Sequence, residues 1–137
     1  MTKSLKTLIR LAKRVVDKEQ ETLGNLQGRW DKFNHQKLGF LENLAKEAKV
    51  AEENPELSAS FGSFASATQI KIRRAEEQMK KLDSRIEFQR EKLREAFAEQ
   101  KKYEIALENK ERAILEEQRK QEQKTLDEIA IQRHSRN

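Results

Sequence analysis

The side chains with the chemistry of a catalyst or a metal ligand are two histidines and many carboxylates, and their spacing favours neither role. His35 lies two residues after the apolar position Phe33, on the outer side of a helical repeat, and His134 lies near the C-terminus. The sequence contains no His-x-x-x-His pair, phosphate-binding glycine loop or nucleophile elbow. It also contains no cysteine, which excludes a disulfide framework and a thiolate metal site. We therefore predict no catalytic residue, no metal site and no cofactor.

The acidic side chains alternate with basic ones at the spacing of one helical turn, as in Glu76 and Lys80 or Glu116 and Lys120. Such pairs lie on a solvated helix face, and each contributes only tenths of a kcal/mol. Catalysis also needs a concave site that excludes water, which two helices side by side do not offer. The pattern indicates a protein that is not an enzyme and has no small-molecule substrate.

The composition favours an elongated helical protein over a compact one. Charged residues make up 39% of the 137 residues and hydrophobic ones 35%, whereas a compact domain has closer to half apolar residues. A seam between two helices needs only two apolar positions in seven. One proline and four glycines leave little to end helices. We predict an all-α fold in one domain, residues 1–137. No apolar run exceeds three residues, so we also expect a soluble protein.

Apolar side chains recur every three or four residues along the first part of the chain, which is the heptad pattern of a coiled coil. The positions are Thr2, Leu5, Ile9, Ala12, Val16, Glu19, Leu23, Leu26, Trp30, Phe33, Lys37, Phe40, Leu44, Glu47 and Ala51, and eleven of these fifteen are apolar. The polar members can fix the register at some cost in stability. Pro55 removes a backbone donor and disfavours helix at the preceding residue. We therefore predict one helix over about residues 2–53 and a turn over 54–60.

A second heptad pattern follows the turn and predicts a helix over about residues 61–132. Its positions are Phe61, Ala65, Thr68, Ile72, Ala75, Met79, Leu82, Ile86, Gln89, Leu93, Ala96, Gln100, Tyr103, Leu107, Lys110 and Ile114. Folding the chain at Pro55 places Phe40 near Ile72 and Ile9 near Tyr103. The result is a long antiparallel two-helix coiled-coil hairpin. Its C-terminal helix overhangs the N-terminus from about Leu115.

The net charge of +5 is concentrated at one end of the chain. Residues 1–18 hold six basic side chains and one acidic one, and the rest holds 23 of each sign. Leu8, Leu11 and Val15 lie beside the seam and widen the apolar stripe there. Such a basic amphipathic helix could lie on a membrane surface. Nucleic acid is disfavoured as a partner, because no aromatic side chain precedes Trp30 and no sequence-reading module is present.

Three regions are thus candidates for contact with other proteins. The first is the basic N-terminus with its wide apolar stripe. The second is the overhang, where Leu126 and Ile129 follow a tract without apolar side chains. A polar helix with a short apolar stripe is usually ordered only when bound. The third is an aromatic tip around Phe40, Phe61 and Phe64.

Both ends of the sequence resemble the FliJ family of flagellar export proteins, particularly the form found in alphaproteobacteria. The opening Lys3-Ser4-Leu5-Lys6-Thr7-Leu8-Ile9-Arg10-Leu11 and the close Arg119-Lys120-Gln121-Glu122-Gln123-Lys124-Thr125-Leu126-Asp127-Glu128-Ile129-Ala130 carry the resemblance. The chain length and the longer second helix are similar as well. The resemblance therefore covers essentially the whole chain.

The resemblance implies a stalk of the flagellar type III protein export apparatus, similar to the γ subunit of rotary ATP synthases. The paired termini would insert into the hexameric export ATPase and promote its assembly and activity, and the tip would face the membrane protein of the export gate. Export chaperones would be further partners, and the location would be cytoplasmic, at the inner-membrane export apparatus. The residues implied at the ATPase end are Lys3, Leu5, Lys6, Leu8, Arg10, Leu11, Arg14, Val15, Leu126, Ile129 and Arg133. Those implied at the gate end are Phe40, Leu41, Phe61, Phe64 and Ile72.

Three other functions remain open at this point. One is the equivalent stalk of a virulence type III secretion system or of another rotary ATPase. The second is a cytoplasmic export chaperone or chaperone escort, which would bind one secreted client and leave ATP hydrolysis unchanged. The third is a membrane-surface adaptor that uses the basic helix and binds anionic lipid in a salt-sensitive way.

Overall fold

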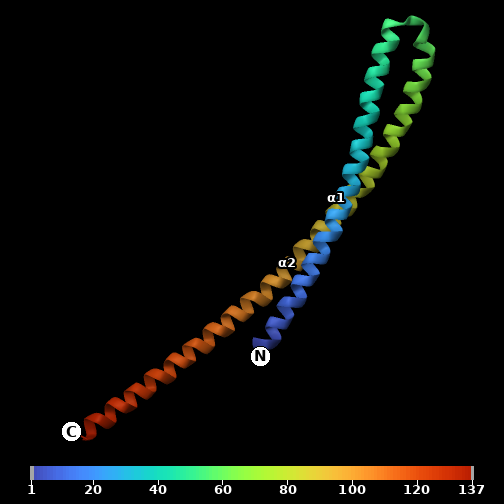
Figure 1. The fold of residues 1–137 in the computed structure, drawn as a ribbon. Coiled ribbons are helices and arrows are strands. Elements are labelled where there is room, and N and C mark those ends of the chain that lie inside the picture. Colours follow the sequence, from blue (N-terminus) through green and yellow to red (C-terminus); the bar gives the residue numbers. More distant parts are fainter. Residues whose placement is uncertain (1, 137) are drawn as a thin grey trace. The chain divides into compact units, whose positions relative to one another are not determined.

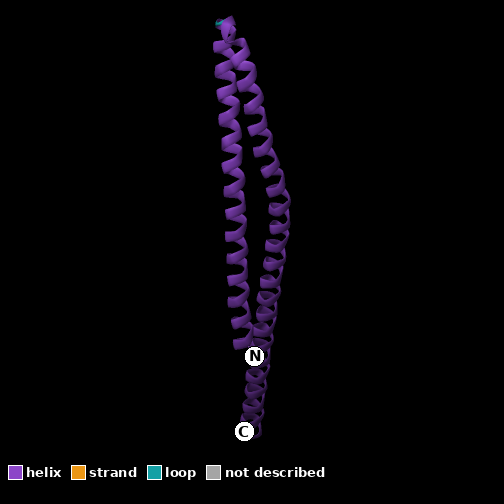
Figure 2. Ribbon diagram, turned by 90° about the vertical axis from the view of Figure 1, so that its right-hand side faces the viewer, coloured by secondary structure: helices purple, strands orange, loops and turns teal. Residues whose placement is uncertain are grey.

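Two long α-helices make up nearly all of the computed structural model, which describes residues 2–136. Helix α1 spans Thr2–Glu53, the 3₁₀ turn η1 spans Pro55–Leu57, and helix α2 spans Ser58–Arg136. Figure 2 shows helix throughout apart from the turn, and the described residues contain no strand. The predicted all-α helical hairpin is confirmed.

The turn is shorter than the sequence suggests. Asn54 leaves the helical region with φ −130° and ψ 86°, as expected before proline. Its backbone N–H and its side-chain Nδ2 both donate to the carbonyl oxygen of Val50, at 3.1 and 3.0 Å. The Ser- and Gly-rich stretch that follows predicted a turn as far as residue 60. Ser58, however, already has helical φ and ψ, so α2 begins there, because only the proline prevents helix.

The packing divides the chain into two units. The hairpin unit is residues 18–94, which comprise the later part of α1, the turn and the first part of α2 (Figure 1). The terminal unit is residues 1–17 and 95–137, which comprise the start of α1 and the rest of α2. In each unit the two helical segments pack against each other in opposite directions.

The hairpin unit is held together by the predicted apolar seam. Ile72, Ala75, Met79, Leu82 and Ile86 of α2 are buried against half-buried seam residues of α1. Burying an aliphatic side chain of this size contributes about 1.5–3 kcal/mol. The register agrees with the prediction to within a turn of helix, since the ammonium of Lys71 lies 5.9 Å from the centre of the Phe40 ring.

Polar seam residues form specific contacts in the same unit. Gln89 is only 5% exposed, and its Nε2 donates to the backbone carbonyl of Glu19 at 3.1 Å and to the Glu19 carboxylate. The ammonium of Lys37 lies 3.6 Å from the carboxylate of Glu76. An unpaired buried amide costs about 1–3 kcal/mol, so these contacts favour one register over its neighbours.

The seam of the terminal unit is shorter. Ala12, Val16 and Ala96 are buried, and Leu107 is half-buried. Lys110 is the last half-buried position, and residues 111–136 are exposed throughout. Pairing of the two heptad patterns predicts that both seams end together near Leu5 and Leu107, and the last half-buried position lies within one helical turn of Leu107. Ile114 continues the heptad pattern but is exposed. The expected overhang of α2 is confirmed, since Figure 1 shows α2 continuing past the start of α1.

One seam position near the turn also differs from its prediction. Glu47 is exposed, and its neighbour Ala48 is half-buried in its place. The predicted pattern is restored at Ala51, which is half-buried, so the difference is confined to one turn of the helix. Helix α2 also extends to Arg136, beyond the predicted end at 132.

Candidate partner-binding surfaces

The terminal unit carries an apolar groove, here called the terminal groove, with a volume of about 210 Å³. Helix α1 contributes Leu8, Leu11, Ala12 and Val15, and α2 contributes Ala96, Glu99 and Tyr103. Leu5 and Ile9 belong to the seam, whereas the neighbouring apolar residues Leu8, Leu11 and Val15 do not. The structure thus brings the three spare apolar side chains of the N-terminus to one site.

These three side chains are available to a partner. Leu8, Leu11 and Val15 are 38%, 47% and 50% exposed. Apolar side chains clustered in a groove are typical of an interaction site, whereas single exposed ones are ordinary. Leu5, which the resemblance also implied at this end, is half-buried and belongs to the seam.

The groove has a polar edge on α2. The hydroxyl of Tyr103 donates to the Glu99 carboxylate at 2.6 Å. This hydrogen bond, with smaller effects of desolvation and of the Glu99 charge, raises the pKa of Tyr103 above its ordinary value. The ammonium of Lys102 lies 5.9 Å from the centre of the same ring. Sequence reasoning placed Tyr103 in the seam and gave no role to Glu99.

Basic side chains occur along the same segment of α1 as the groove but do not line it. Lys3, Lys6, Arg10 and Arg14 are all exposed. Across residues 2–136, none of the four side chains forms an ion pair or a hydrogen bond. Their positive charge is therefore uncompensated locally and is available to an acidic partner.

The overhang, residues 111–136, is a separate surface of the terminal unit. Leu126, Ile129 and Arg133 are exposed on it and do not line the terminal groove. Ile131 is the most exposed large apolar side chain described, at 68%. The sequence contained a signal for it, the apolar run Ile129-Ala130-Ile131, but it was not among the predicted contact residues.

The tip of the hairpin unit carries the second apolar groove, here called the tip groove, of about 240 Å³. It is lined by Glu47, Val50 and Ala51 of α1, Leu57 of the turn, and Ser60, Phe61 and Phe64 of α2. Phe61 and Phe64 were predicted at this end. Leu57 was expected to cap the end of the hairpin with these two residues, although it was not among the predicted contact residues. Val50 was missed, although it is an apolar residue outside the heptad pattern near the proline.

The other residues predicted at the tip lie elsewhere in the hairpin unit. Phe40 is about 20 Å along α1 from Glu53, and it lines a different groove with Phe33 and Lys71. Leu41 is exposed at 42%, but it does not line the tip groove. Ile72 is only 8% exposed and belongs to the seam. The prediction placed these three residues at the tip because they are apolar, and it did not account for their distance from the turn.

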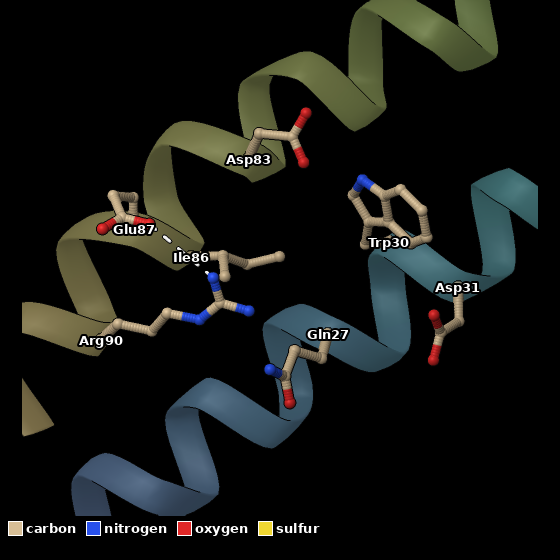
Figure 3. Close-up of a pocket in the computed structure, with 7 residues that line it drawn as sticks. All are labelled: Gln27, Trp30, Asp31, Asp83, Ile86, Glu87 and Arg90. Carbon is tan, nitrogen blue, oxygen red and sulfur yellow. Dashed lines mark ion pairs between the residues drawn. The ribbon is translucent and has the colours of Figure 1, made fainter.

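A further groove of the hairpin unit, about 480 Å³, is lined in part by Trp30 (Figure 3). Its other lining residues are Gln27, Asp31, Asp83, Ile86, Glu87 and Arg90. The indole nitrogen of Trp30 is buried and has no hydrogen-bond partner within residues 2–136. Arg90 and Glu87 form an exposed ion pair at 3.7 Å, and such a pair is worth about 1 kcal/mol at most. This lining contains hydrogen-bonding groups but no His, Cys or Ser nucleophile.

The described residues contain neither a candidate metal site nor a candidate membrane-spanning helix. Residues 2–136 contain no group of three or more His, Cys, Asp or Glu side chains that could hold a metal ion. No helix in that range is both long enough and apolar enough to cross a membrane.

The two grooves and the overhang are the candidate surfaces for other proteins, and a comparison with known families identifies the family of the chain. The family model described as "Flagellar FliJ protein" matches residues 1–137, the whole chain. The chain belongs to the FliJ family. No curated protein and no solved structure matches it.

Membership of the FliJ family makes the chain a component of the flagellar export apparatus, a type III secretion system. The FliJ family is a structural and export family and not a known family of enzymes. The resemblance seen at the two ends of the sequence is confirmed. The partners and contact residues that it implied remain predictions.

Proposed function

We propose that this FliJ-family chain is the stalk of the flagellar export apparatus. Its terminal unit inserts into the hexameric export ATPase and promotes assembly and ATP hydrolysis. Its tip contacts the membrane protein of the export gate, so that the chain couples the two. In this proposal the chain works in the cytoplasm, at the inner-membrane export apparatus, and also receives export chaperones.

The observation that carries the proposal is the combination of surfaces in the terminal unit. A helix exposed along residues 111–136 adjoins a groove lined by Leu8, Leu11 and Val15, which are open to solvent. The helix has no partner within the described chain, and a polar helix of this kind gains most of its order from binding. Insertion into the opening of a ring would supply partners for both the helix and the groove.

The charge of the terminal unit supports a protein partner of opposite sign. The exposed cations at Lys3, Lys6, Arg10 and Arg14 speed up association with an acidic surface and orient the chain on it. The apolar groove supplies the affinity, because charges at the rim contribute more to the association rate than to the strength of binding.

The test is ATP hydrolysis by the export ATPase of the same organism, with and without the full chain. A second sample lacks residues 111–137. Every described residue of that segment is exposed, so its removal leaves the seam intact. We expect the full chain to stimulate hydrolysis and the truncated chain to lose most of this effect. Circular dichroism of both chains checks that the remaining seam is folded.

Absence of stimulation by the full chain, under conditions in which the ATPase forms hexamers, would overturn the stalk mechanism. One-to-one binding to a secreted client without any change in hydrolysis would then support an export chaperone. Equal stimulation by both chains would overturn the role of the overhang and leave the terminal groove as the contact.

A further inference from the structure

The tip groove combines apolar walls with a negative rim. Leu57 and Phe64 are each 40% exposed, and Val50 is 43% exposed. Residues 50–70 contain the acids Glu52, Glu53 and Glu56 and no basic side chain. Glu47 adds a fourth carboxylate in the lining of the groove itself. Lys49 is the one basic residue between Glu47 and residue 70, so the apolar contacts lie next to an excess of negative charge.

The four carboxylates have no partners of their own. Within residues 2–136, none of Glu47, Glu52, Glu53 and Glu56 takes part in an ion pair or a side-chain hydrogen bond. Elsewhere in the hairpin unit some acids are paired, as Glu76 is with Lys37 and Glu42 is with Lys46, whereas others such as Glu77 and Asp83 have no ion pair within the described residues. The tip therefore repels acidic surfaces and attracts basic ones.

The groove is held in shape by its own turn. The two bonds from Asn54 to the Val50 carbonyl end α1, and the backbone N–H of Leu57 donates to the Asn54 carbonyl at 2.9 Å. The hydroxyl of Ser58 donates to the Pro55 carbonyl at 2.9 Å. A pre-shaped site loses little conformational entropy when it binds a partner.

We propose that the tip groove binds a short protein segment in which apolar side chains are flanked by Lys and Arg. The groove, at about 240 Å³, is below the size of a site for a drug-sized molecule and suits individual side chains of a segment. This inference rests on the proposed function, which places the export gate at the tip. It adds the chemistry of the segment that is recognised there.

Charge distinguishes the partners that could meet this tip. The cytoplasmic surface of a membrane carries anionic lipid, which repels the tip carboxylates. Cytoplasmic loops of membrane proteins, in contrast, are enriched in Lys and Arg. A basic loop of a gate protein therefore has the charge that the tip attracts. Residues 2–18 of a second copy are also basic and apolar, and the experiment below separates that occupant from a gate segment.

The experiment uses the full chain and a set of overlapping peptides that covers the cytoplasmic segments of the export-gate membrane proteins of the same organism. Binding is measured by fluorescence anisotropy at low and high salt. We expect binding by peptides that are basic and contain apolar anchors, and weaker binding at high salt. L57S/F64S should weaken binding by about tenfold or more. E52K/E53K/E56K should weaken it by about tenfold at low salt.

A matched control keeps the charge change and moves it away from the tip. E21K/E95K/E111K replaces three exposed glutamates and alters the net charge by the same amount. It should leave peptide binding within about twofold. The decisive step is a charge exchange, in which Lys and Arg of the bound peptide become Glu. This peptide should bind E52K/E53K/E56K and fail to bind the native chain.

Several results would overturn the inference, and each is distinct from failure of the stalk function. If the native chain stimulates the ATPase but binds none of the peptides, the stalk function stands and the tip inference is wrong. Stronger binding of E52K/E53K/E56K than of the native chain to every basic peptide would also contradict it. Self-association in analytical ultracentrifugation that E52K/E53K/E56K abolishes would identify a second copy as the occupant. Tip-dependent binding to vesicles of one part phosphatidylglycerol in about four would identify lipid.

Discussion

The terminal groove and the tip groove share one construction and differ in charge. Each is formed where a few apolar residues lie beside the seam, Leu8, Leu11 and Val15 in one unit and Val50, Leu57 and Phe64 in the other. The α1 segment of the first carries unpaired cations, and the second has unpaired carboxylates. The seam is thus built alike in both units, and the two grooves differ in the residues beside it, which we propose select the partner.

The largest expected effect comes from removing the apolar side chains of the terminal groove. L8S/L11S/V15S should weaken binding to the export ATPase by about a hundredfold, if each side chain contributes about 1 kcal/mol on burial. The measurement is stimulation of ATP hydrolysis as a function of chain concentration. Peptide binding at the tip should be unchanged.

The control for this variant is L38S/I70S, which replaces two exposed apolar residues that line neither groove. Stimulation should stay within about twofold of the native value. Equal loss in both variants would mean that general surface hydrophobicity, and not the terminal groove, drives binding to the ATPase.

The next effect concerns the seam that carries both grooves. Gln89→Ala removes the hydrogen bonds to Glu19 and opens space in the seam, so the free energy of unfolding should fall by about 1–3 kcal/mol. Urea unfolding followed by circular dichroism measures this. Gln121→Ala removes an exposed hydrogen bond to Glu117 and should change stability by less than about 0.5 kcal/mol. Equal values for the two would contradict a role of Gln89 in the register.

Charge reversal at the N-terminus should have a smaller effect that depends on salt. K6E/R10E/R14E is expected to weaken stimulation of the ATPase by about tenfold at low salt and by much less near 1 M salt. The cause is loss of attraction between exposed charges, which salt screens. A loss that is the same at both salt concentrations would indicate that these residues pack in the interface.

The smallest expected effect is on the stability of the overhang. Leu126→Ala should change the free energy of unfolding by less than about 0.5 kcal/mol, because the side chain is exposed. The same variant should reduce stimulation of the ATPase, since the Leu126 side chain, exposed in the free chain, is proposed to become buried on binding. A large loss of stability would show that Leu126 packs within the chain.

The seam could be predicted almost completely from the sequence because its cause is local. Heptad spacing of apolar residues decides which face of a helix is buried, and Pro55 decides where the chain turns. Two positions depart from the heptad pattern. Ile114 continues the pattern but lies beyond Lys110, the last half-buried position, and Glu47 is exposed whereas its neighbour Ala48 is half-buried.

The grooves could be predicted only in part. Leu8, Leu11 and Val15 were recognisable from the sequence as apolar residues that lie outside the heptad positions of the seam. For the tip groove, Leu57, Phe61 and Phe64 were recognisable as apolar residues at the end of the hairpin, but Val50 was not, because the walls come from the turn as well as from both helices. Leu57 contributes from η1, and Phe40 and Ile72 face other surroundings. Which side chains share a groove depends on how the turn closes, and residue types alone do not specify this.

If the two grooves bind different partners, as we propose, site-specific photocrosslinking should capture each partner from its own groove. A photoreactive phenylalanine analogue would be placed at Leu11 or at Phe64 of the full chain, in a mixture of the export ATPase and the cytoplasmic part of the gate protein. We expect position 11 to crosslink to the ATPase and position 64 to crosslink to the gate protein. Crosslinks from both positions to the same partner, or with the partners exchanged, would contradict the proposal.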